Sequence, residues 1–125
     1  MKSILRLAAV FVIAGSLSGC QAQGPSSYSD ISELHDAFTR AGGTCSNWNQ
    51  DNRVSAALQS GECDANTILM LFGSKAEATE RALEIKNTLK SFGLVPNLLL
   101  GENWLINSDQ VDTVSTKLGG ILISD

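Results

Sequence analysis

The chain has 125 residues, of which 43% are hydrophobic and 18% are charged, and this length suits one small domain and excludes two. Nine side chains are basic and 13 are acidic; two of the basic ones lie in an N-terminal leader, and without them seven face 13, a net charge of −6. We therefore expect no nucleic-acid partner, because neutralising phosphates requires a basic surface. A domain of this size has a small core, which favours a covalent crosslink.

Residues 1–19 have the pattern of a secretory signal peptide. Lys2 and Arg6 precede an unbroken apolar run at residues 7–14, and Gly15 and Ser16 follow it. Eight apolar residues are too few to span a bilayer. The leader therefore predicts export followed by cleavage.

The end of the leader, Leu17-Ser18-Gly19-Cys20, resembles the lipobox of bacterial lipoproteins. This resemblance covers the first 20 residues and implies that Cys20 carries diacylglycerol, with palmitate-type acyl chains, and becomes the first residue of the mature protein. An ordinary secretion signal with a chance cysteine is the alternative. Two acyl chains anchor a protein stably. The expected location is the extracytoplasmic face of the cell membrane, with the lipid bilayer as a partner.

The two other cysteines, Cys45 and Cys63, form an even pair if Cys20 is lipidated. In an oxidising compartment we expect them to be bonded, closing a loop of about 19 residues that contributes roughly 3 kcal/mol. A redox or metal pair fits poorly, because there is no Cys-x-x-Cys spacing and His35 is the only histidine. We expect no cofactor and no metal.

Residues 20–29 are rich in Gly, Pro, Ser and Gln, which predicts a flexible tether before a single domain at residues 30–125. Gln21 follows the lipidation site where Asp would give the usual inner-membrane retention signal of a two-membrane bacterium. The sequence leaves the choice of membrane open.

The first half of the domain begins with a helix capped by Asp30, and Gly42-Gly43 ends it. A short strand at 44–48, a polar turn at 47–52 and a second break at Ser60-Gly61 are expected to follow. The inward face of the helix is predicted to hold Ile31, Leu34, Phe38 and Ala41.

The second half begins with an apolar run at 67–72, which predicts a central strand. Ser74 caps the next helix and Gly93 ends it. A hairpin at 97–100 and 104–106, a helix capped by Ser108 or Asp109, and a strand at 121–123 complete the order. The expected inward residues of the two helices are Ala78, Ala82, Ile85, Leu89 and Phe92, and then Val111, Val114 and Leu118.

This order predicts an α+β fold, a small two-layer sandwich with a mainly antiparallel sheet of about five strands, helices on one face and one disulfide. More loosely, Gly101-x-Asn103-Trp104 and Leu118-Gly119-Gly120 are similar to segments of small uncharacterised secreted proteins and lipoproteins of actinobacteria. That resemblance implies no known activity.

Two patterns in the sequence are candidates for chemical sites. His35 lies at the edge of the apolar stripe of the first helix, which favours a surface or boundary histidine over a catalytic base. The turn Asn47-x-Asn49-x-Asp51 begins like a calcium loop, but Asn52 replaces the expected Gly and Leu58 the expected Glu. An Asx-rich turn is the favoured interpretation.

Trp48, Trp104 and Asn103 lie in or beside polar loops, which makes them a candidate interaction surface; packing in the core is the favoured alternative for the tryptophans. The function expected from the sequence is a membrane-anchored envelope lipoprotein that displays a small non-enzymatic binding domain for an unknown envelope protein or ligand, with prophage-associated exclusion as one such role. The alternative is an envelope enzyme or a small-ligand-binding lipoprotein.

Overall fold

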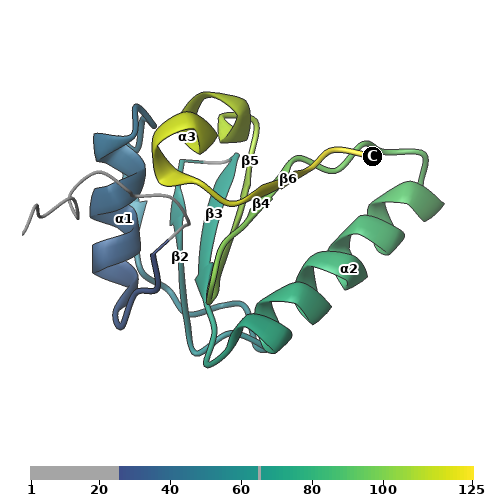
Figure 1. Ribbon diagram of the computed structural model, residues 1–125, viewed down its shortest axis with the longest axis horizontal. Helices are drawn as coiled ribbons and strands as arrows, with labels where there is room; N and C mark the ends of the chain where they lie inside the picture. Colours follow the sequence, from purple (N-terminus) through teal and green to yellow (C-terminus); the bar gives the residue numbers. More distant parts are fainter. Residues whose placement is uncertain (1–25, 65) are drawn as a thin grey trace, which may run out of the picture.

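The computed structural model describes residues 26–64 and 66–125, and within these ranges the chain forms three helices and six strands (Figure 1). The order of elements is helix, three strands, helix, hairpin, helix, strand, where two or three strands were expected between the first two helices. The elements are α1 (Ile31–Arg40), β1 (Trp48–Asn49), β2 (Gln59–Cys63), β3 (Thr67–Leu71), α2 (Lys75–Ser91), β4 (Leu98–Leu100), β5 (Trp104–Ser108), α3 (Val111–Leu118) and β6 (Ile121–Ile123).

The six strands form one sheet in the order β1-β2-β3-β5-β4-β6, and every neighbouring pair is antiparallel. The predicted α+β class and antiparallel sheet are confirmed, with six strands where about five were expected. β1 and β6 are the two edges of the sheet, and β3 and β5 lie at its centre.

The helices cover both faces of the sheet, whereas the sequence interpretation put them on one (Figure 1). α2 connects β3 to β4, and α3 connects β5 to β6; each connection crosses one intervening strand and steps in the same direction. Because β3 and β5 are antiparallel, two such crossovers can share the strongly preferred hand only if their helices lie on opposite faces. We call the two sides the α1/α3 face and the α2 face.

Alternation along the central strands explains why both faces need cover. In β3, Leu69 and Leu71 join the core under α1 and α3, while Met70 joins the core under α2. In β4, Leu99 points to the first of these cores and its two neighbours to the second. An apolar run without alternation is typical of a strand that is buried on both sides.

The α1/α3 face has a closed core. Ile31, Leu34 and Phe38 from α1 are fully buried, as expected from their spacing, and they share one cluster with Trp104 and Ile106 of β5. α3 adds its three expected inward residues, which are Val111, Val114 and Leu118.

The α2 face is only partly covered, and Phe92, expected to point inward, is 74% exposed. Ala78 and Ala82 are the buried residues of α2, which packs on β4 and β5. A helix of 17 residues is about 25 Å long, whereas the three residues of β4 span only about 10 Å. The C-terminal half of α2 therefore extends beyond the sheet.

The break expected at Ser60-Gly61 lies inside β2, so that prediction is wrong. The ring of Trp48 lies against Gly61, where any Cβ would overlap it, so this glycine makes room for an aromatic ring in a continuous strand. The first strand also differs: it has two residues, Trp48–Asn49, where 44–48 was expected.

The helix caps agree with the sequence at α1 and α2 and differ at α3. Asp30 and Ser74 accept hydrogen bonds from the backbone N–H groups of Ser32 and Glu77. The N-cap of α3 is Gln110, instead of Ser108 or Asp109. The Gln110 side chain bonds both the N–H and the C=O of Thr44, at 2.7 and 3.1 Å, and so ties α3 to the segment that follows α1.

Candidate functional site

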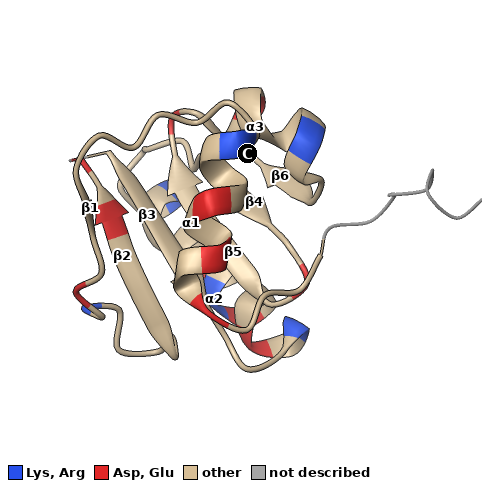
Figure 2. Ribbon diagram, turned by 90° about the vertical axis from the view of Figure 1, so that its left-hand side faces the viewer, with Lys and Arg blue, Asp and Glu red and all other residues tan. Residues whose placement is uncertain are grey.

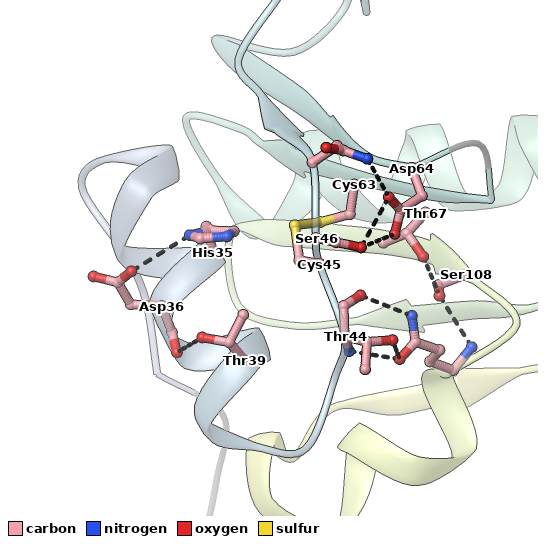
Figure 3. The surroundings of a disulfide bond; sticks show 12 residues. His35, Asp36, Thr39, Thr44, Cys45, Ser46, Cys63, Asp64, Thr67 and Ser108 are labelled. Atoms are coloured by element: carbon pink, nitrogen blue, oxygen red, sulfur yellow. Dashed lines mark hydrogen bonds and ion pairs between the residues drawn. A yellow bond between two sulfur atoms is a disulfide. The ribbon is translucent and has the colours of Figure 1, made fainter.

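The disulfide between Cys45 and Cys63 is present, with the two Cα atoms 4.7 Å apart (Figure 3). This confirms the pairing expected from the sequence. Cys63, in β2, is fully buried, and Cys45 packs against the same core from the loop after α1. The bond fixes that loop to the sheet, because β1 alone is too short to do so.

His35 lies next to this disulfide and stacks on Trp48, with ring centroids 4.6 Å apart and planes inclined by 26° (Figure 3). Its Nδ1 atom is 3.4 Å from a carboxylate oxygen of Asp36, and its side chain is 21% exposed. Nε2 is buried and has no hydrogen-bond partner among the described residues. His35 is thus a boundary histidine packed on an indole, with no nucleophile positioned at Nε2.

Trp104 lies in the core with no exposed surface. Its ring lies against Gly101, where a Cβ would overlap it, and its Nε1–H donates a 2.8 Å hydrogen bond to the carbonyl oxygen of Ser26. The ring of Tyr28 packs beside it at 6.3 Å. Trp104 therefore does not form an exposed edge with Trp48. Its indole N–H instead holds the chain that leads into α1 at Ser26.

Asn103 also holds the incoming chain. Its Oδ1 accepts from the Tyr28 N–H at 3.0 Å, and its Nδ2 donates to the Tyr28 carbonyl at 2.8 Å and to that of Phe72 at 3.3 Å. The sequence motif Asn103-Trp104 thus docks residues 26–28, which the sequence placed in a flexible tether at 20–29. Nothing in the pattern of the sequence itself indicated this pairing over 75 residues.

The calcium-like turn does not gather its oxygen atoms. Asn47 donates to Asp64, Asn49 pairs with Glu62 in the sheet, and Asp51 caps a local turn by accepting from the N–H of Arg53. Among residues 26–64 and 66–125, no group of three or more His, Cys, Asp or Glu side chains could hold a metal ion. These contacts agree with an Asx-rich turn.

Charged groups are spread thinly over the described surface. Acidic and basic residues are interspersed on the side that shows α1 and α3 (Figure 2). On the α2 face, hydrogen bonding to Asp51 and repulsion by its charge raise the pKa of Glu62 above the ordinary 4.5, while Arg53 opposes the shift. This polar group lies at the β2 end of that face.

The opposite end of the α2 face is apolar and exposed. We call five residues at this end of the sheet the β6 edge patch; they come from the end of α2, the loop after it, and β6, and one of them, Leu122, faces the α1/α3 side. A surface hollow of about 350 Å³ connects the loop, at Leu94 and Val95, to the chain after β6, at Ser124 and Asp125. The patch consists of Phe92, Leu94, Val95, Ile121 and Leu122, which are 74%, 55%, 67%, 55% and 43% exposed.

Cys20 and the leader lie outside the described residues. In the part of the chain that the structure describes, no helix is long and apolar enough to cross a membrane. Comparisons with known protein families, with curated proteins and with solved structures find no match to this chain.

Proposed function

We propose that this chain is a cell-envelope lipoprotein, anchored through diacylglycerol on Cys20, that displays a small non-enzymatic interaction domain. The lipobox-like sequence Leu17-Ser18-Gly19-Cys20 is the basis for the anchor. The docking of residues 26–28 onto Asn103 and Trp104 supports the display of the domain in one orientation, because it fixes the point at which the chain leaves the domain. Six residues from Cys20 to Ser26 reach at most about 20 Å, so an anchored domain stays close to the bilayer.

The observation that carries the proposal is the position of the β6 edge patch relative to this point of departure. Ser26 lies on the α1/α3 side, lining a hollow of about 390 Å³ with Arg40 and Lys117. Basic side chains near a membrane surface are attracted to anionic lipid headgroups. The C-terminal end of α2 lies at the other end of the molecule (Figure 1). The exposed apolar residues at the end of α2 and in the loop after it then face away from the anchor.

The anchor is tested with two cysteine variants of the full chain expressed in a bacterium and labelled with a palmitate analogue. Cys20→Ser is expected to lose the label and to leave the membrane fraction or remain as an uncleaved precursor. The matched control, Cys45→Ala with Cys63→Ala, removes the other two cysteines and is expected to keep the label and the membrane location. Unchanged labelling and mobility of Cys20→Ser contradict the proposal.

A further inference from the structure

β6 leaves one side of its backbone unpaired. Among the described strands it pairs only with β4, and it forms the edge of the sheet. Natural proteins usually protect such an edge with charges, proline or a bulge, because free N–H and C=O groups recruit further strands. The sequence of β6 is Ile-Leu-Ile, which contains no charge and no proline; its length of three residues is the one protective feature of this edge.

The side chains of β6 are apolar on both faces of the sheet. Ile121 and Ile123 are opposite Leu100 and Leu98, which belong to the α2-face core, so these isoleucines point to that face. Leu122 is opposite Leu99 and points to the α1/α3 face. A strand that adds to this edge therefore meets apolar side chains above and below it.

The exposed area is large for a protein of this size. Together, and over both faces of the sheet edge, the five residues of the β6 edge patch expose on the order of 500 Å² of apolar surface. A standard interface buries roughly 800 Å² per partner, and the free backbone edge of β6 adds to the apolar area. The patch therefore supplies more than half of the area that a dimer interface of this kind needs.

We propose that β6 pairs in antiparallel fashion with β6 of a second copy of this chain, joining the two sheets across a two-fold axis. With the axis at Leu122, that residue meets its own equivalent, and Ile121 of one copy lies opposite Ile123 of the other. Both faces of the new pair are then apolar, and no charged side chain lies within either strand. A two-fold interface requires such self-complementarity.

A second copy fits this surface better than a lipid surface does. A bilayer covers apolar side chains but offers no regular set of groups to an open strand edge, whereas a second β6 satisfies both requirements. The inference does not depend on the anchor at Cys20, because it rests on β6 and the residues beside it. Anchoring two copies in one membrane would only favour their encounter.

The test is photo-crosslinking of the full chain in intact bacterial cells, with two differently tagged copies expressed together. Benzoylphenylalanine replaces Phe92, so that an aromatic ring is kept, or Leu122 in a second variant. The expected product joins both tags at twice the mass of one chain. The control replaces Leu58, which is 67% exposed and follows the polar turn on the β2 side of the sheet; it is expected to give no such product.

A lysine in the edge tests the pairing itself. Ile121→Lys adds one positive charge to each copy on the same face of the pair, at diagonal positions about 7–8 Å apart, and it removes an apolar contact with Ile123. The crosslink from Phe92 is expected to fall about tenfold or more. Leu58→Lys is expected to leave it unchanged, and Ile121→Thr, which keeps a β-branched residue, separates loss of pairing from loss of folding. Absence of a product with both tags, a product only with lipid or another protein, or a crosslink that survives Ile121→Lys overturns the proposal.

Discussion

The α1/α3 face and the α2 face of the sheet are built from equally apolar strands, but they differ in how completely other elements cover them. On the first, two helices, the Cys45–Cys63 disulfide and the docked residues 26–28 cover the core. On the second, one helix covers the centre and then extends beyond the sheet. Most apolar residues on the first face are buried, with Leu122 at the edge of the sheet exposed, whereas several on the second remain exposed.

The same contrast separates two aromatic side chains, Trp104 on the first face and Phe92 at the end of α2. Trp104 has no exposed surface, and Phe92 is 74% exposed. Sequence spacing puts Phe92 on the inward stripe of α2, but nothing of the sheet lies beneath it. The difference indicates that the first face maintains the fold and that the β6 end of the second is available for binding.

The largest expected effect is that of Trp104→Ala. It removes a fully buried ring and the hydrogen bond to Ser26, and we expect it to lower the free energy of unfolding by about 3–5 kcal/mol. The matched variant Phe92→Ala is expected to change it by no more than about 0.5 kcal/mol in dilute solution. Urea unfolding of the full chain, followed by far-ultraviolet circular dichroism, measures both. Equal losses from the two variants would remove the distinction between the faces.

The disulfide gives the next largest effect, and it belongs to the α1/α3 face alone. Replacing Cys45 and Cys63 together by Ala is expected to lower the free energy of unfolding by about 2–5 kcal/mol, because the closed loop is polar and β1 has only two residues. Thermal unfolding with and without reductant measures the loss, and reduction should not lower the stability of the double variant further. The chain with its native sequence can also be unfolded without reductant and its thiols titrated; two free thiols from Cys45 and Cys63 would contradict the bond.

Much of this architecture could be predicted from short-range sequence signals. Helical spacing identified the buried residues of α1 and α3, and capping residues identified the first turns of α1 and α2. Cysteine counting gave the disulfide. These features depend on residues close in sequence, or on a pair with no alternative partner.

The errors have long-range causes. The inward stripe of α2 predicted burial at Phe92, but burial also depends on the length of the strands beneath the helix, and β4 is short. The sequence predicts a break at Gly61. In the structure the ring of Trp48 needs the space beside this glycine, and a residue 13 positions away leaves no local signal of that need. The same holds for Asn103, whose partner Tyr28 is separated from it by 75 residues. No local pattern records such contacts.

A smaller effect is expected at Asn103, which holds the start of the described chain against the α1/α3 face. Asn103→Leu leaves the backbone N–H and C=O of Tyr28 without their partners, and we expect a loss of about 1–3 kcal/mol. Amide hydrogen exchange should be faster at Tyr28, while β3 and β5 keep their protection. The control is Glu102→Gln, since among the described residues the Glu102 side chain makes one polar interaction, with the exposed Lys75. Unchanged protection at Tyr28 would show that Trp104 alone holds this segment.

The smallest effect concerns the polar β2 end of the α2 face. Asp51 raises the pKa of Glu62 in the folded protein, so Glu62 binds its proton more tightly in the folded chain than in the unfolded one. Protonated Glu62 therefore raises the free energy of unfolding at pH values below its ordinary pKa of 4.5. This stabilisation is lost as the pH rises through the higher pKa of the folded protein. Glu62→Gln should become more stable relative to the native chain as the pH rises across this window. Carboxyl NMR titration should also show that Asp51→Asn lowers the pKa of Glu62; an unchanged pKa would assign the shift to burial, and the polar end would then owe nothing to this pair of carboxyl groups.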